Sequence, residues 1–176
     1  EYFRQTSRVA EIARRVTETE HRPSLLSRIK SVILSPRSPR GFSIQDGLLN
    51  ADDNFIASMR KTPERVMEVF ATAARHQLAL PAELRRVIGK VAARLPAEPS
   101  RKSCHHFRAV LRAGAGLPLT LRAMYETKVL DWLIPQVAEI RCLMQFNQYH
   151  SYTVDEHTLK TIDEVVAFAD DESPVG

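Results

Sequence analysis

Apolar residues recur at steps of three and four along most of the chain, which is the spacing of helices that bury one face. The clearest stripe joins Leu84, Val87, Ile88, Val91 and Leu95. Similar stripes predict helices over residues 2–20 and 25–34, after Asp52 or Asp53, over 63–73, up to Leu111, from Pro118 to Met144 with an interruption at Pro135, and after Thr153. The pattern therefore predicts a mainly α fold, a helical bundle of about seven helices.

One short β element is expected among these helices. Asp46 and Gly47 separate two short apolar pieces, Phe42–Ile44 and Leu48–Leu49. Asp-Gly between such pieces is a hairpin signal. An isolated hairpin is marginal in water, so this one must pack against helices.

Helix starts and stops are marked by capping residues and prolines. The predicted N-caps are Asp52 or Asp53, Thr62 followed by Pro63, and Ser100 or Ser103. Gly114 and Gly116 are expected to end the helix that contains Val110. The two prolines and the glycine of residues 35–41 predict a loop.

Composition supports a domain of ordinary size with a real core, since 44% of the 176 residues are hydrophobic. Only 6 of them are glycine, which favours helices. No apolar run is long enough to span a membrane, and the N-terminus has no secretory signal. Cys104 and Cys142 are far apart and indicate neither a disulfide framework nor a zinc knuckle. We therefore expect free thiols and a reduced, cytoplasmic compartment.

Charge is distributed unevenly along the chain. Residues 1–112 contain 21 Lys and Arg against 11 Asp and Glu, a formal charge of +10, whereas residues 113–176 contain 4 against 10, a formal charge of −6. A basic surface attracts nucleic acids and phosphates. Here, however, the arginines are spread singly along helices and no aromatic residues are interleaved for base stacking, so nucleic-acid binding is a minor alternative.

The segment around His157 carries the most specific chemistry. Thr153 and Glu156 stand in a capping-box relation, which makes Val154 the first helical residue and puts His157 on the first turn. Asp155 and Glu156 place negative charge at the positive end of this helix. An apolar face is expected from Leu159, Ile162, Val165, Val166 and Phe168.

A histidine held this rigidly suits a metal ligand, but divalent metals need several converging ligands. Taken by its pattern alone, His157 is more often a solvent-facing or hydrogen-bonded residue. Cys104, His105 and His106 are adjacent and point to different faces of a helix, so we expect a buried thiol beside exposed imidazoles. Met124, Met144 and Trp132 lie on helical stripes and are expected to pack in the core.

Several pieces of the sequence resemble one enzyme family. Met144-Gln145, Tyr149-His150 and the seven residues from Tyr152 to Thr158 resemble the segment leading into the HD-type domain of bifunctional protein-PII uridylyltransferase/uridylyl-removing enzymes. Weaker likeness covers Tyr2-Phe3-Arg4, Phe55, Pro63, Phe70, Met124, Thr127, Val129-Leu130 and Ile134-Pro135. The chain departs from the family at Asn147 and Gln148, at Lys128, where glycine is common, and at Tyr125, where asparagine is common.

The resemblance implies a place within a longer protein. In this family a transferase domain attaches UMP to a tyrosine of the signalling protein PII, an HD-type domain removes it by metal-assisted hydrolysis, and C-terminal domains sense glutamine. Residues 1–145 would be the helical linker domain after the transferase, and residues 146–176 the first helix of a truncated HD-type domain. His157 matches the first histidine ligand of the HD set, and His150 matches a position with a supporting or packing role.

The sequence is thus expected to be a piece cut from a larger enzyme, with the transferase motifs before Glu1 and the His-Asp doublet beyond Gly176. On its own it would be non-catalytic and would bind no cofactor. Mg²⁺ or Mn²⁺ and UTP would belong to the longer enzyme, whose partner is PII. The alternatives are a free-standing helical interaction or regulatory module and a basic nucleic-acid binder. Apolar surface left for the missing domains would favour self-association.

Overall fold

The computed structural model describes residues 41–144 and 152–169. The helices predicted over 2–20 and 25–34 lie outside these residues, as does most of the predicted loop. Within them the chain forms eight α-helices and one two-stranded hairpin, which confirms the mainly α class.

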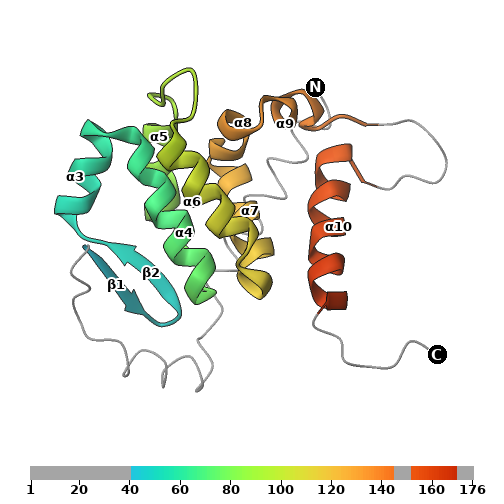
Figure 1. The fold of residues 1–176 in the computed structure, drawn as a ribbon, viewed down its shortest axis with the longest axis horizontal. Coiled ribbons are helices and arrows are strands. Elements are labelled where there is room, and N and C mark those ends of the chain that lie inside the picture. The colour runs from blue at the N-terminus through green and yellow to red at the C-terminus, as the bar shows by residue number, and fades with distance from the viewer. Residues whose placement is uncertain (1–40, 145–151, 170–176) are drawn as a thin grey trace.

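The elements follow one another as β1 (Phe42–Gln45), β2 (Leu48–Ala51), α3 (Asp53–Lys61), α4 (Val66–His76), α5 (Ala82–Ala92), α6 (Arg101–Leu111), α7 (Leu117–Glu126), α8 (Val129–Leu133), α9 (Pro135–Ile140) and α10 (Val154–Ala169). Short 3₁₀ turns η1 (Pro63–Arg65) and η2 (Gly114–Gly116) precede α4 and α7. The hairpin and α3 lie at one end of the long axis and α10 at the other (Figure 1).

The predicted hairpin is confirmed. β1 and β2 pair antiparallel, and the two residues between them, Asp46 and Gly47, have φ values of 51° and 77°, the positive values that a two-residue turn requires. The hairpin packs on helices as expected. The ring centroids of Phe42 and of Phe55 in α3 are 4.4 Å apart, and Leu49 is fully buried.

Of the paired N-cap candidates, Asp52 rather than Asp53 and Ser100 rather than Ser103 cap their helices. Each accepts a hydrogen bond from the backbone N–H three residues on, at 2.7 Å for Asp52 and 3.2 Å for Ser100. Thr62 precedes a helical turn as predicted, but its side chain makes no capping bond and the turn is 3₁₀. Its ψ of 84° is far from the extended values at Asp52 and Ser100, 166° and 163°.

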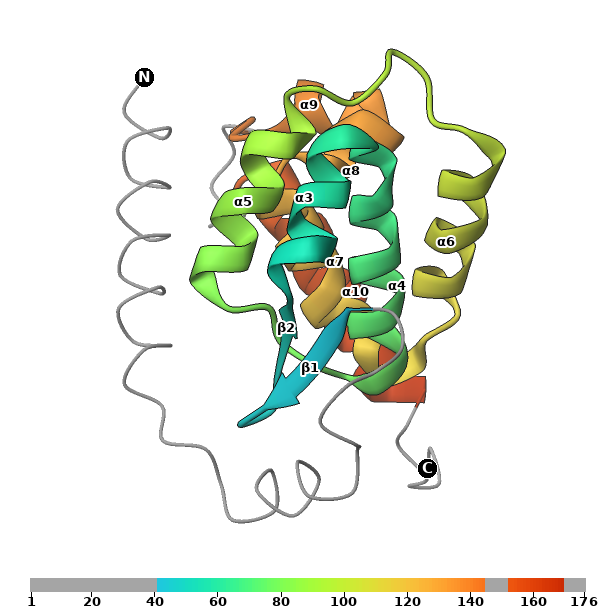
Figure 2. The same ribbon diagram turned by 90° about the vertical axis from the view of Figure 1, so that its left-hand side faces the viewer.

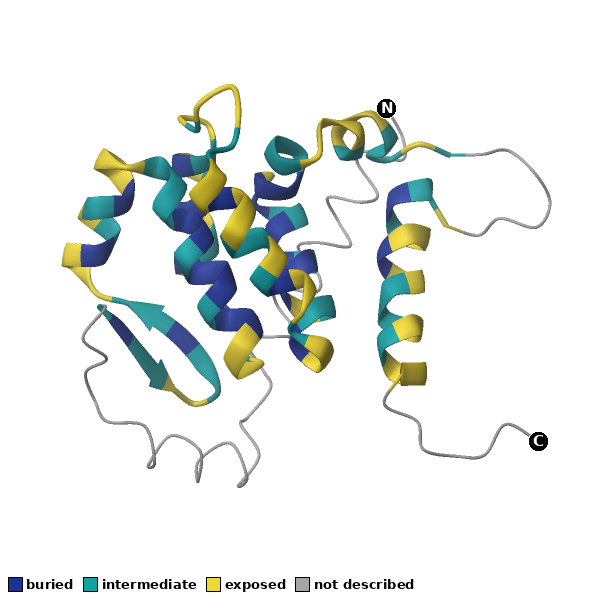
Figure 3. Cartoon of the chain, viewed as in Figure 1, coloured by how far each residue is buried: buried dark blue, intermediate teal, exposed yellow. Residues whose placement is uncertain are grey.

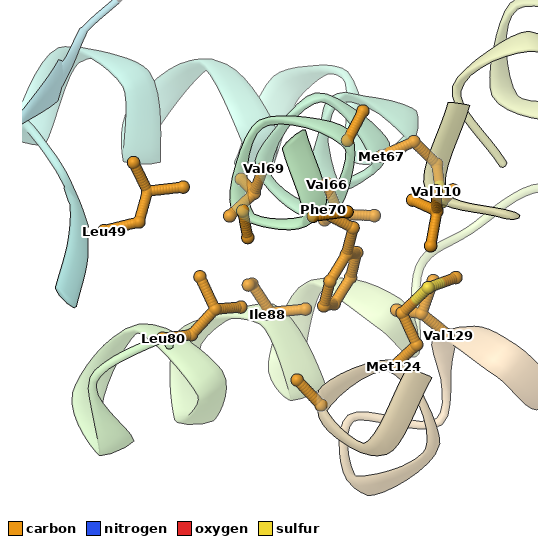
Figure 4. Packing of buried hydrophobic residues seen from close by; sticks show 14 of the residues in the cluster. Leu49, Val66, Met67, Val69, Phe70, Leu80, Ile88, Val110, Met124 and Val129 are labelled. Carbon is orange, nitrogen blue, oxygen red and sulfur yellow. The ribbon is translucent and has the colours of Figure 1, made fainter. Parts of the chain in front are cut away.

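Helix α4 lies at the centre of the core. Nearly every side of it is buried, including Val66, Met67, Val69, Phe70, Ala71, Ala73 and Ala74. Such a helix must be surrounded by other elements. Figure 4 shows Phe70 of α4 between Ile88 of α5 and Met124 of α7. The predicted stripe of α5 is confirmed, since Leu84, Ile88 and Val91 are buried.

The single helix predicted from Pro118 to Pro135 is wrong. The chain breaks between α7 and α8, where Lys128 has a φ of 63°, a left-handed conformation that strains a residue with a Cβ. No proline or glycine marks this break. The helix resuming after Pro135 also ends at Ile140 rather than Met144, because Cys142 again takes a positive φ of 57°.

Replacing Lys128 with glycine should therefore raise the free energy of unfolding by about 1 kcal/mol, because glycine adopts positive φ without a steric cost. Equilibrium denaturation in urea measures the change. Lys128→Ala removes the charge but keeps the Cβ, so it should give no such gain. Equal stabilisation by the two substitutions would attribute the effect to charge instead.

Candidate functional site

Helix α10 begins as the sequence predicts. The His157 N–H donates to the Thr153 carbonyl at 2.8 Å, Val154 is the first helical residue, and His157 stands on the first turn. The His157 side chain is exposed, with Nδ1 3.4 Å from the Thr161 hydroxyl, which also donates to the His157 carbonyl at 2.9 Å. The imidazole thus lies on the outer side of a regular helical turn.

The opposite side of this turn is anchored by Asp155, which is buried. Its carboxylate accepts a hydrogen bond from the Tyr125 hydroxyl of α7 and another, at 2.8 Å, from the Cys142 N–H. Burial by itself would raise the pKa of Asp155, but hydrogen bonds from Thr153, Tyr125 and Cys142 hold that pKa below its usual value. Burial and the bond to Asp155 raise the pKa of Tyr125. The pair is therefore a charged carboxylate and a neutral phenol at neutral pH.

A second anchor is the guanidinium of Arg122, also in α7. It donates from Nη1 to Glu156 Oε1 at 3.0 Å and from Nη2 to Asp163 Oδ2 at 2.6 Å. These two carboxylates lie two turns apart on α10, so one arginine fixes both the position and the direction of the helix. The sequence assigned the Glu156 carboxylate to a capping box, whereas the structure points it at Arg122.

Tyr125 is itself held from behind. The Arg141 guanidinium lies 3.6 Å from the centroid of the Tyr125 ring and donates to the Tyr125 carbonyl at 2.9 Å. Arg141 also pairs with Asp131 of α8 at 2.6 Å. A cation over an aromatic ring is attracted to its face. Arg141, in the segment after α9, thereby connects α7 with α8, and Arg122 and Tyr125 connect α7 with α10. We call the residues of these contacts the anchor network: Arg122, Tyr125, Asp131, Arg141, Asp155, Glu156 and Asp163.

Sequence reasoning missed most of the anchor network. It gave Asp155 and Glu156 no role beyond capping, and it treated Tyr125 only as a departure from a family pattern. The partners Tyr125 and Asp155 are 30 residues apart, and Arg122 and Asp163 are 41 apart. Helical periodicity reports only contacts within a few turns, so it contains no signal for these pairs.

The predicted apolar face of α10 is divided between two environments. Leu159 is buried and Ile162 is partly buried against the core, as expected. Val165 and Phe168 are instead 61% and 68% exposed. Figure 3 shows exposed positions along much of α10. Val165 and Phe168 lie on the outer side with His157 and Thr161, because these four positions are spaced by four, four and three residues. Exposed apolar side chains gathered on one stripe indicate a surface for contact with other protein.

The described ranges, 41–144 and 152–169, contain no group of three or more His, Cys, Asp or Glu side chains arranged to hold a metal ion. His157 is therefore not brought together with further ligands there.

The prediction that the Cys104 thiol is buried is wrong. Cys104 is exposed and His106 is the partly buried residue, because α6 turns positions 103, 106 and 110 toward the core.

Core packing is confirmed for Met124, which is fully buried. Trp132 is only partly buried, and its indole N–H donates to the Pro96 carbonyl at 2.7 Å. His150, the other histidine expected near the site, lies outside the described residues.

No helix in the described part of the chain combines the length and the apolar character that a membrane crossing demands.

The chain is similar to the bifunctional uridylyltransferase/uridylyl-removing enzymes of two strains of Caulobacter vibrioides. Each is 32% identical over 126 residues, which cover 69% of this chain and 13% of the relative. No family model matches the chain, and no solved structure matches it significantly. The similarity supports the family suggested by the sequence motifs. The chain spans only a small part of the length of these relatives.

Proposed function

We propose that this chain is a segment of a bifunctional uridylyltransferase/uridylyl-removing enzyme. Residues 1–145 would form the helical linker after the transferase domain, and residues 146–176 would begin the HD-type hydrolase domain. Two observations support this assignment: the similarity over 69% of the chain, and a helix that starts at Val154 with His157 on its first turn.

His157 would be the first histidine ligand of the hydrolase metal site. The observation that carries this role is the two-sided character of α10. Its inner side is fixed by Asp155 and Arg122, while the imidazole on its outer side faces away from the bundle. A ligand on a helix that is already held in place loses little freedom when metal binds. The other ligands would come from residues beyond Gly176, and the bound divalent ion would activate water for hydrolysis.

The exposed stripe of α10 supports the same arrangement. Val165 and Phe168 are large apolar side chains that are mostly exposed in this segment. The rest of a hydrolase domain would cover them and would lie on the same side of α10 as His157. The anchor network would then hold that domain against the linker, so that the linker keeps the transferase and hydrolase sites at a fixed separation.

Under this proposal the segment itself performs no catalysis. UTP, together with Mg²⁺ or Mn²⁺, would bind elsewhere in the longer enzyme, and the PII signalling protein would be its substrate. A free-standing interaction module is the second candidate, favoured by the same exposed stripe, because Val165 and Phe168 could equally contact a separate protein.

The test is made in the full-length enzyme with His157→Ala. The substitution should weaken Mn²⁺ binding to the hydrolase domain by at least about 10-fold. It should abolish the removal of UMP while the attachment of UMP continues, because the two reactions use different domains. Mn²⁺ titration and separate assays of the two reactions measure these effects.

His76→Ala is the matched control, since His76 is also exposed and lies at the far end of α4. It should leave metal binding and both reactions unchanged. Metal affinity and UMP removal that survive His157→Ala would exclude His157 as a ligand. A reading frame that ends close to Gly176 would exclude the whole assignment in favour of the interaction module.

A further inference from the structure

Helices α4 and α6 pack side by side (Figure 2). Their side chains leave an open hollow of about 520 Å³ at the surface. Two small residues line it, Ala109 of α6 and Ala113 just beyond that helix. Its other lining residues are Arg75 of α4, His105 and Arg108 of α6, and Arg112, which follows the last residue of α6. Cationic side chains from two helices thus surround one depression, which we call the arginine hollow.

No carboxylate lines the arginine hollow. Within the described residues, Arg75, Arg108 and Arg112 form no ion pair. Several, though not all, of the other arginines of the bundle differ from these three. Arg65, Arg86, Arg122 and Arg141 each pair with Asp or Glu at 3.1 Å or less. The positive charge of the hollow is therefore not compensated by the folded bundle itself.

Arg75 and Arg108 stand in the last turns of α4 and α6, and Arg112 is the C-cap residue of α6. A cation at a helix C-terminus interacts favourably with the helix dipole, so each of these positions by itself favours an arginine. The dipole does not remove the repulsion among three cations that line one depression. A ligand with several negative charges would relieve that repulsion.

The cationic surface extends past Arg75 into a second hollow that contains Lys102 and His106. There Glu68 lies against Lys102, with 3.1 Å between Oε1 and Nζ. This second hollow is partly neutralised, so an anion would be attracted to the arginine hollow rather than to its neighbour.

We propose that the arginine hollow binds the phosphate chain of a small compound with two or more phosphate groups, such as a nucleoside diphosphate or triphosphate. Each guanidinium has a planar fork of N–H donors that matches phosphate oxygens. Three of them around one depression require a ligand with several negative charges close together. The lining offers no Phe, Tyr or Trp on which successive bases could stack, which disfavours single-stranded nucleic acid.

The test is calorimetric titration of the full chain with tripolyphosphate at about 0.15 M salt, where diffuse surface attraction is screened. Arg108→Gln and Arg75→Gln should each weaken binding by about 10-fold or more, because each removes charge-assisted hydrogen bonds. Arg101→Gln is the matched control. It removes an equal charge from an exposed position of the same helix, outside the hollow, and should change binding by less than about 2-fold.

Three results would overturn the proposal. An equal loss in Arg101→Gln would show a diffuse field rather than a site. Citrate binding as tightly as tripolyphosphate would show a surface that binds any polyanion. A single-stranded oligonucleotide binding more tightly than nucleoside triphosphate would show a surface for nucleic acid.

Discussion

Replacing Gly116 with alanine is expected to destabilise the bundle by about 3 kcal/mol or more. A Cβ at this position would lie 1.9 Å from the carbonyl oxygen of Ala74 and 2.8 Å from its carbonyl carbon. Both atoms belong to the backbone of α4, the most buried helix, so no flexible side chain can move aside. Relief of the clash requires α4 and the start of α7 to separate, which opens the core that they share.

The control for this prediction is Gly89→Ala. Gly89 lies inside α5, and a Cβ built there meets no atom within 4 Å. Alanine should therefore raise the free energy of unfolding by about 0.5–1 kcal/mol, because glycine in a helix costs that much. Urea denaturation followed by circular dichroism measures both variants. Similar stabilities for the two alanine variants would contradict the close approach of η2 to Ala74.

The role of Gly116 shows where sequence reasoning stops. The sequence predicts that Gly114 and Gly116 end a helix, and α6 does end before them, at Leu111. That prediction uses only local backbone preference. The need for glycine at position 116 arises from a helix 42 residues earlier in the chain, and no local pattern records it. Backbone φ is −81° at Gly116, so conformational preference gives no hint either.

Other local signals were sufficient by themselves. Asp46-Gly47 located the hairpin, Asp52 and Ser100 located two helix starts, and Thr153 located the start of α10. Each of these acts within a few residues of its own position. The break at Lys128 was missed because its chain conformation opposes its residue type. Tertiary packing of α7 and α8 overrides the local preference there, as it commonly does.

The anchor network, like the need for glycine at position 116, depends on contacts between residues that are far apart in the sequence. His157 was identified from a motif, but the side chains that hold its helix come from α7 and from the turn after α9. An exposed ligand on a fixed helix differs functionally from the same ligand on a frayed terminus, because only the first is ready to join ligands from another element. The linker would thus determine the geometry of the proposed metal site without touching the metal.

Asp155→Ala should therefore have the second large effect, a loss of about 3 kcal/mol in the free energy of unfolding. The substitution removes a buried carboxylate that accepts hydrogen bonds from the partly buried Tyr125 hydroxyl and Cys142 N–H. It also removes a negative charge from the first turn of α10. Urea denaturation measures the loss, and hydrogen exchange along α10 should rise at the same time, because the helix is released from α7.

The pH dependence gives an independent check on the same carboxylate. Because its pKa is lower in the folded state than the ordinary 3.8, Asp155 contributes stability that is present above pH 3.8 and is lost as pH falls through the folded pKa. The difference in stability between the wild type and Asp155→Asn should shrink over that acid range. Asp53→Asn, at an exposed first-turn position of α3, serves as control and should cost only about 0.5 kcal/mol. Equal losses of stability in Asp53→Asn and Asp155→Asn would show that Asp155 acts only as a charge at a helix end. The anchor network would then not explain how His157 is held.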